Sequence, residues 1–254
     1  NLANRDLLYL GVSGDGDSAS IGLGQFANAM RRGVRMAYIV ENNGVYGLTK
    51  GQFSATADRG SRSKKGVVNN DSPVDLVGIA LQLGATYVAR SFSGDKAQLV
   101  PLIKGAMTHG GAAFIDVISP CVTFNNHGGS TKSYDYVRQH NDAVSRIDFV
   151  SPRSEITTQY EPGSLVEVQQ HDGSVLRLRK LHPDYDPTDR YAAMSYLNAH
   201  DARGEVVTGL LYVDPMATDL HTALNTTDKP LNSLGAAQLC PGTRALDKIN
   251  AGLR

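Results

Sequence analysis

The chain has 254 residues, of which 41% are hydrophobic, and its 25 Lys and Arg residues balance 25 Asp and Glu residues. This composition is typical of a globular protein with one sizeable domain and appendages, and it excludes a fibrous or disordered chain. The zero net charge excludes a general electrostatic attraction to nucleic acid or to an anionic membrane, so partners have to be inferred from individual sites.

The sequence predicts neither a membrane span nor a signal peptide within the residues given. No apolar run approaches the roughly 18 residues that a membrane span requires, and residues 1–10 lack the charged and apolar regions of a signal peptide. We therefore expect a cytoplasmic protein, and the low number of cysteines, Cys121 and Cys240, fits a reducing compartment.

The first residue is Asn rather than Met, and a strand-like run begins at Leu7. We expect an N-terminal segment to be missing.

Short apolar runs alternate with helical patterns from residue 7 to residue 119. This alternation predicts an α/β fold in which a mostly parallel sheet is flanked by helices. Because the runs are apolar throughout, we expect strands that are buried on both faces. These runs are Leu7 to Val12, Val34 to Val40, Thr86 to Ala89 and Ala113 to Ile118.

Two helices and a loop are predicted between these strands. Apolar residues recur at positions i, i+3, i+4 and i+7 over residues 23–30, which predicts a helix that Gly33 terminates. A second helix is expected from Ser72, as its cap, to Gly84. The interval from Gly44 to Asp71 is rich in Gly, Ser, Lys and Asn and has no periodicity. We expect a functional loop there.

The pattern changes after residue 120, which divides the chain into a first domain, residues 1–120, and a C-terminal extension, residues 121–254. In the extension, Ser164 to Gln170 and Ser174 to Leu181 alternate polar and apolar residues around a glycine-containing turn. This pattern predicts a β-hairpin. A helix, a strand and a final helix are then expected at residues 191–200, 205–213 and 243–253.

Polar residues follow the first two predicted strands. Gly14-Asp15-Gly16-Asp17 follows one and Asn42-Asn43 follows the other, so both groups should meet at the carboxyl edge of the sheet. Asp15 and Asn43 carry oxygen ligands that suit Mg²⁺, with a nearby backbone carbonyl as a third. The glycines would let the backbone approach a diphosphate, and a helix beginning near Ser18 would offer N–H groups to it. A lone Gly-Asp-Gly sequence is also typical of a tight turn, and the pairing with the asparagines favours a cofactor site.

The paired motifs resemble the fingerprint of thiamine-diphosphate enzymes. In that fingerprint the aspartate, the second asparagine and a carbonyl two residues further on bind the metal. The resemblance implies that Asp15, Asn43 and the carbonyl of Val45 hold Mg²⁺. It also implies that the thiamine diphosphate site includes Gly14, Asp15, Gly16, Asp17, Asn43, Tyr46 and Leu48.

Longer runs narrow the resemblance to one family. Residues 43–52 read Asn-Gly-Val-Tyr-Gly-Leu-Thr-Lys-Gly-Gln and resemble the β subunit of 2-oxoacid:ferredoxin oxidoreductases. Residues 120–125 and 182–190 are similar to the same subunit, so the resemblance spans most of the chain. One departure is Ala55, which stands where such subunits usually have Pro and removes a residue with a fixed φ from the loop.

The family resemblance implies a reaction and partners. It implies oxidative decarboxylation of a 2-oxoacid with coenzyme A, giving an acyl-CoA, CO2 and reduced ferredoxin, in a heteromer with an α subunit. The α subunit would supply the activating carboxylate, so we expect this chain to be inactive alone. Family members with the Leu-Thr-Lys-Gly-Gln run tend to act on 2-oxoglutarate or on a broad range of 2-oxoacids, and the resemblance implies the same here. The positive charge of Lys50 could pair with a distal carboxylate or with the phosphates of coenzyme A. The alternative for Lys50 is a solvated loop lysine.

The two cysteines are interpreted differently. In the family, the cysteine of Pro-Cys-Val-Thr-Phe-Asn ligates a [4Fe–4S] cluster, which implies the same role for Cys121. Such clusters normally require four thiolates, and the other three would lie in the missing N-terminal segment. The alternative is a buried structural cysteine. Cys240 matches no cluster spacing, and His127 is interpreted as a solvated loop residue.

Two other functions remain open at this point. A non-oxidative thiamine-diphosphate-dependent decarboxylase or synthase would share the metal motif, although residues 46–52 and 120–125 favour the ferredoxin-linked enzyme. A structural or nucleotide-binding domain could retain the fold without the cofactor. Such a domain would give no calorimetric response to thiamine diphosphate with Mg²⁺.

Overall fold

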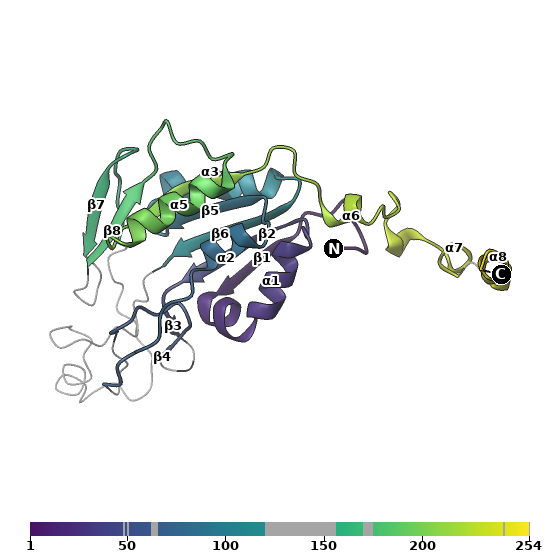
Figure 1. Ribbon diagram of the computed structural model, residues 1–254, viewed down its shortest axis with the longest axis horizontal. Coiled ribbons are helices and arrows are strands. Elements are labelled where there is room, and N and C mark those ends of the chain that lie inside the picture. The colour runs from purple at the N-terminus through teal and green to yellow at the C-terminus, as the bar shows by residue number, and fades with distance from the viewer. Residues whose placement is uncertain are drawn as a thin grey trace, which may run out of the picture.

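The computed structural model describes residues 1–47, 49, 51–61, 66–119, 156–169, 175–240 and 242–253. Its centre is a seven-stranded sheet with the strand order β1-β2-β6-β5-β9-β8-β7 (Figure 1). Four of its neighbouring strand pairs are parallel, and the pairs β5–β9 and β7–β8 are antiparallel. The strands are β1 (Leu10–Gly14), β2 (Met36–Asn42), β5 (Tyr87–Phe92), β6 (Ala112–Ile118), β7 (Leu165–Gln169), β8 (Val175–Lys180) and β9 (Val206–Val213). The predicted α/β fold with a mostly parallel sheet is confirmed.

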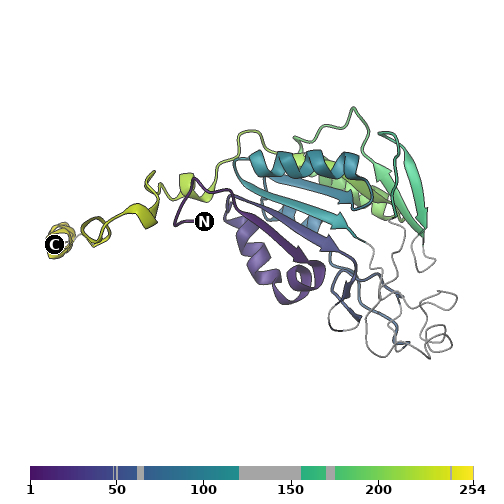
Figure 2. The ribbon, with the colours of Figure 1, turned by 180° about the vertical axis from the view of Figure 1, so that it is seen from behind.

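Helices cover both faces of the sheet. Helices α1 (Leu23–Arg31), α2 (Leu76–Gln82) and α5 (Arg190–Asp201) pack on one face, where the ring of Phe26 meets Phe114 edge-on at 5.0 Å. Helix α3 (Lys96–Thr108) packs on the opposite face, which Figure 2 shows from behind. Strands β2, β6 and β5 are therefore enclosed by two hydrophobic layers.

The first strand differs from its prediction. It begins at Leu10 rather than Leu7 and forms the edge of the sheet. The side chains of Leu10 and Val12 remain exposed, because α3 packs over the neighbouring strands and not over β1. The expectation of a strand buried on both faces is therefore wrong for β1 and holds for the central strands.

Both predicted helices end at the expected glycine, but the second begins later than predicted. Gly33 and Gly84 follow α1 and α2 with φ of +64° and +91°, as expected for helix-terminating glycines. The predicted cap at Ser72 is wrong, since α2 begins only after Asp75. The carboxylate of Asp75 accepts hydrogen bonds from the N–H groups of Val77 and Gly78, at 3.1 and 3.0 Å.

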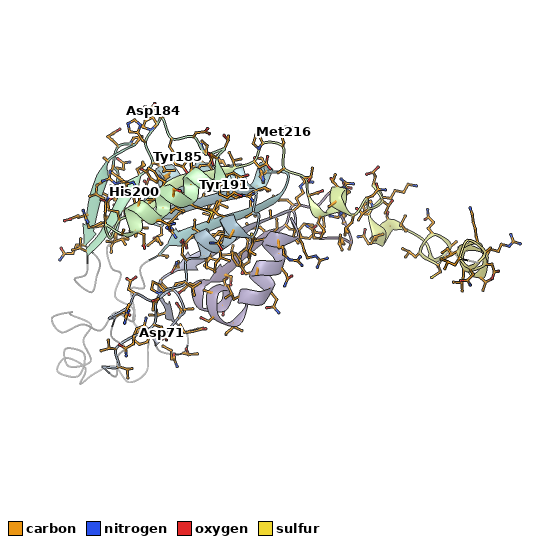
Figure 3. The ribbon with its side chains drawn as sticks, in the orientation of Figure 1. Asp71, Asp184, Tyr185, Tyr191, His200 and Met216 are labelled. Carbon is orange, nitrogen blue, oxygen red and sulfur yellow. The ribbon has the colours of Figure 1, made fainter. Side chains whose placement is uncertain are left out.

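The residues after position 120 add three strands to the same sheet. The predicted hairpin is confirmed as β7 and β8, whose turn lies outside the described residues, and β9 joins β8 to β5. The segment 182–190 connects β8 to α5, where the hydroxyl of Tyr185 donates to the carbonyl of Leu211 at 2.8 Å. Tyr185 is labelled in Figure 3. The predicted domain boundary at residue 120 stays a prediction. The strands that follow it belong to the same sheet as the strands that precede it.

The C-terminal part of the chain extends away from the sheet (Figure 1). It contains α6 (Leu220–Ala223), the 3₁₀ helix η2 (Leu231–Ser233), α7 (Ala236–Leu239) and α8 (Thr243–Ala251), the last of which matches the predicted final helix. None of the helices in the described part of the chain combines the length and the apolar character of a membrane span.

A buried ionic cluster joins the end of α5 to β8 and β9. Glu205 Oε2 lies 2.7 Å from Nδ1 of His200 and 2.5 Å from Nε of Arg179. His200 is labelled near the end of α5 in Figure 3. The hydrogen bonds from Arg179 and His200 lower the pKa of Glu205 to about 2. The ionised carboxylate therefore stabilises the folded state.

We expect Glu205→Gln to lower the free energy of unfolding at neutral pH, because the folded pKa of Glu205 is depressed. The stabilisation by Glu205 is fully present above its ordinary pKa of 4.5 and is lost as the pH falls towards 2. Urea unfolding of wild type and variant should therefore differ at pH 7 and converge near pH 2. Glu167→Gln is the matched control, since Glu167 forms an exposed ion pair with Arg177 at 3.6 Å. A constant difference across this pH range would contradict the prediction.

Candidate functional site

The two polar motifs meet at the carboxyl edge of the sheet. Strands β1 and β2 are parallel neighbours, and Gly14 pairs in register with Glu41, so the residues that follow them emerge side by side. The backbone N–H groups of Asn43 and Gly44 lie 3.4 and 3.0 Å from the carboxylate oxygens of Asp15. The structure thus brings together Asp15 and Asn43, which the sequence placed at one edge.

Asp15 is a buried carboxylate, only 1% exposed. Its Oδ2 atom accepts hydrogen bonds from the hydroxyls of Ser54 and Thr56, the latter at 2.5 Å, and from the N–H of Gly44. Its Oδ1 atom receives one long contact from the described residues, that from Asn43. Oδ2 is therefore occupied by donors, and Oδ1 has the free lone pair that a cation would need.

Ser54 and Thr56 were not singled out as site residues from the sequence. They lie in the loop after β4, about forty positions from Asp15, and no spacing rule relates a loop hydroxyl to a distant carboxylate. The loop contains a small hairpin of β3 (Val45–Tyr46) and β4 (Gln52–Phe53), which returns the chain to Asp15. The signal available was their position on either side of Ala55, shortly after the family-like run of residues 43–52.

The loop is tethered at the position where the family usually has Pro. The N–H of Ala55 donates to Oγ of Ser20 at 3.0 Å, a bond that proline could not form. The carbonyl of Ala55 accepts from the N–H of Val74 at 2.7 Å. Two hydrogen bonds therefore hold this segment in place of a fixed φ.

Asn43 and Val45 form a tight turn beside Asp15. The N–H of Val45 donates to Oδ1 of Asn43 at 3.1 Å, and Gly44 between them has φ of +74°. The amide oxygen of Asn43 thus faces its own loop and retains a second lone pair. Asp15, Asn43 and the carbonyl of Val45 would together offer only oxygen ligands, the type that Mg²⁺ requires.

Gly16 and Tyr46 contact each other closely. The hydroxyl of Tyr46 donates to the carbonyl of Gly16 at 2.9 Å, and a Cβ atom on Gly16 would lie 2.5 Å from the tyrosine ring. The close packing of Tyr46 is a reason for glycine at this position that is independent of any diphosphate. This contact fixes β3 against the start of the next helical segment.

The helical segment after Asp15 starts earlier than predicted. A π-helix, η1 (Gly16–Ile21), precedes α1, so Ser18 is already inside it. Asp17 is exposed on η1, and its carbonyl accepts from the N–H of Gly22 at 2.6 Å. Gly14 ends β1, where an added Cβ would come no closer than 3.7 Å to the Asp17 carboxylate.

Three of the predicted site residues lie outside the described residues. They are Leu48, Lys50 and Cys121. Cys240 is an exposed free cysteine that follows α7, away from the sheet. Within the described ranges, no group of three or more His, Cys, Asp and Glu side chains could hold a metal ion. The candidate metal site thus depends on one carboxylate combined with amide and carbonyl oxygens.

The site lies in a part of the chain with recognisable relatives. Residues 1–117 match the family described as thiamine pyrophosphate enzyme, C-terminal TPP binding domain. The β subunit of a 2-oxoacid:ferredoxin oxidoreductase from Saccharolobus solfataricus is 44% identical over 128 residues, covering 49% of this chain and 41% of that protein. The 2-oxoglutarate oxidoreductase subunit KorB from Mycobacterium tuberculosis is 37% identical over 126 residues, covering 49% of this chain and 34% of that protein.

A solved structure extends the similarity beyond the N-terminal half. The 2-oxoglutarate:ferredoxin oxidoreductase from Magnetococcus marinus, with 2-oxoglutarate, coenzyme A and succinyl-CoA bound, superposes with a TM-score of 0.62 and 29% identity. The superposition covers 87% of this chain and 62% of that chain, and the matches to the two curated relatives named above span less than half of their length. Residues 1–117 thus match a thiamine-pyrophosphate-binding domain, and the chain is similar to the β subunits of 2-oxoacid:ferredoxin oxidoreductases.

Proposed function

We propose that this chain is the thiamine-diphosphate-binding β subunit of a 2-oxoacid:ferredoxin oxidoreductase that acts on 2-oxoglutarate or a related 2-oxoacid. The observation that carries the proposal is the meeting of buried Asp15 with Asn43 and Val45 at the carboxyl edge of the sheet. The matched thiamine-pyrophosphate-binding family and the named relatives support it. The reaction would produce an acyl-CoA, CO2 and reduced ferredoxin.

Asp15, Asn43 and the carbonyl of Val45 would hold Mg²⁺ against the diphosphate of the cofactor. When bound, thiamine diphosphate supplies the carbanion chemistry of the decarboxylation. Gly14, Gly16 and Asp17 would line the diphosphate side of the site, and Tyr46 and Leu48 would line it from the loop. The protein thereby positions the cofactor and restricts the access of water.

Other parts of the reaction are assigned to residues outside the described ranges and to partners. Lys50 would form a charge-assisted hydrogen bond with the distal carboxylate of the 2-oxoacid or with the phosphates of coenzyme A. Cys121 would supply one thiolate of a [4Fe–4S] cluster. An α subunit would supply the activating carboxylate, and ferredoxin would accept the electrons. A cytoplasmic location is consistent with these partners.

We expect Asp15→Asn to weaken the Mg²⁺-dependent binding of thiamine diphosphate by about a hundredfold or more, since loss of an outer-shell partner alone costs about 10- to 100-fold. Isothermal calorimetry of the assembled full-length protein, with Mg²⁺ present and absent, measures this affinity. Asp184→Asn is the control, because Asp184 is an exposed carboxylate on the far side of the sheet (Figure 3). Equal affinities for Asp15→Asn and wild type would exclude Asp15 as the metal ligand.

We expect the full-length protein, co-expressed with its α subunit, to reduce ferredoxin when 2-oxoglutarate, coenzyme A and thiamine diphosphate are supplied. The iron content should be near four per αβ unit if one [4Fe–4S] cluster is present. Omission of coenzyme A should abolish product release, and omission of the α subunit should abolish turnover. Release of an aldehyde without ferredoxin would instead identify a non-oxidative decarboxylase. Absence of cofactor binding would leave only a structural domain.

Substitution of Lys50 tests the choice of substrate. We expect Lys50→Met to raise KM for 2-oxoglutarate by about tenfold, because a charge-assisted bond to the distal carboxylate is lost. KM for pyruvate, which has no distal carboxylate, should stay unchanged in the same preparation. A matching increase in KM for coenzyme A would assign Lys50 to the phosphates instead. No change for any of these ligands would identify a solvated lysine.

A further inference from the structure

A buried ion pair lies on the two central strands, next to the candidate metal site. Arg90 on β5 and Asp116 on β6 are register partners, and Nε of Arg90 lies 2.8 Å from Oδ2 of Asp116. Asp116 is completely buried, and the side chain of Arg90 is 14% exposed. A second bond of 2.7 Å joins Nη2 of Arg90 to Asp75, the N-cap of α2.

The fold alone gives little reason for this ion pair. Val88 and Phe114 precede Arg90 and Asp116 on the same faces of their strands and belong to the hydrophobic core. Removing two charges from water is costly, and well-packed apolar side chains at such positions often leave stability equal or higher. Burial would lower the pKa of Arg90, but the carboxylates of Asp75 and Asp116 outweigh it and raise the pKa, so the guanidinium stays charged. A charged pair at these positions therefore does more than fill the core, because it supplies hydrogen-bonding groups inside the sheet.

Hydrogen bonds connect the ion pair to the metal-site carboxylate. Asp116 Oδ1 accepts from the side-chain amide of Asn42 at 3.1 Å, and Oδ1 of Asn42 lies 3.0 Å from the hydroxyl of Thr56. The same hydroxyl lies 2.5 Å from Oδ2 of Asp15. The connection thus runs from Arg90 through Asp116, Asn42 and Thr56 to Asp15.

The chemistry of each group fixes the orientation of the next. Oδ2 of Asp116 accepts from Nε of Arg90 and Oδ1 accepts from the NH2 group of Asn42, so the amide oxygen of Asn42 faces Thr56. The single hydroxyl proton of Thr56 is shared between Oδ1 of Asn42 and Oδ2 of Asp15 as a three-centre hydrogen bond, and the shorter contact, 2.5 Å, is the one to Asp15. This arrangement leaves Oδ1 of Asp15 for a cation. Within a buried network, each bond is also stronger than it would be in water.

We propose that Arg90, Asp116, Asn42 and Thr56 are positioning residues that hold Asp15 in the orientation required for Mg²⁺ and thiamine diphosphate. This inference rests on the proposed function, because it assigns an outer layer of contacts to the same site. Residues that orient metal ligands typically change metal affinity about 10- to 100-fold when they are replaced. The network should therefore affect Mg²⁺ affinity more than it affects folding.

Thr56 offers a matched pair of variants for the test. In the assembled full-length protein, Mg²⁺ is titrated at a fixed concentration of thiamine diphosphate, and thermal unfolding is measured in chelator. We expect Thr56→Val, which keeps the shape and removes the hydroxyl, to weaken Mg²⁺ binding about tenfold. Thr56→Ser should retain most of the affinity, because it keeps the hydroxyl. Equal weakening by Val and Ser, or none by Val, would overturn the inference.

A double-mutant cycle tests whether the ion pair acts through the network. We expect Asp116→Asn to weaken Mg²⁺ binding about tenfold in the wild-type background and to have almost no further effect in Thr56→Val. Multiplicative effects, or an unchanged affinity in Asp116→Asn, would show that Asp116 does not position Asp15. If Asp116→Asn fails to fold, Asn42→Ala replaces it in the cycle, since that change leaves both members of the ion pair in place.

Two controls distinguish a positioning role of the network from general destabilisation and from a failure to bind the cofactor. Arg179→Gln breaks the ion pair with Glu205, far from Asp15, and should lower the unfolding temperature while leaving Mg²⁺ affinity unchanged. A lower Mg²⁺ affinity in Arg179→Gln would mean that general destabilisation explains the other variants, which overturns the inference. A wild-type protein that binds no thiamine diphosphate with Mg²⁺ would instead overturn the proposed function itself.

Discussion

The burial of the Asp15 carboxylate is the constraint on which the candidate site depends. An ionised carboxylate removed from water requires hydrogen-bond donors or a cation nearby. The donors come from Gly44, Ser54 and Thr56, which all belong to the segment after β2. That segment therefore has to turn back at Gly44, form the β3–β4 hairpin and return its two hydroxyls to the end of β1. The path of this segment is therefore linked to the hydrogen bonds that Oδ2 of Asp15 accepts.

Much of the fold was predictable from the sequence because the governing signals are local. Apolar runs located the central strands, and alternating residues located the β7–β8 hairpin. The predicted meeting of Asp15 with Asn43 required only that two consecutive strands be parallel neighbours. The insertion of β9 between β5 and β8 was not predictable, since strand order across such a distance depends on contacts that a single sequence does not display.

The part of the site that was missed had a weak signal in the sequence. The third strand was predicted over Thr86 to Ala89, yet β5 continues to Phe92 and includes Arg90. Asp116 stands alone among apolar residues in a run that was interpreted as fully buried. A charged residue inside such a run requires a partner of opposite charge. The opposite charges of Arg90 and Asp116 therefore indicated a buried ion pair. The pairing register of β5 and β6, which places the two residues opposite each other, could not be read from the sequence.

The C-terminal strands also influence the electrostatics of the site. Strand β9 pairs with β5, and Gly209 lies opposite Arg90, where an added Cβ would come within 2.9 Å of Leu181. Without β9, β5 would be the edge of the sheet, and water would reach Arg90 and Asp116 from the side. Water would screen their attraction and would compete for the amide of Asn42. The strands after residue 120 thus cover the open edge of β5, the strand that carries Arg90.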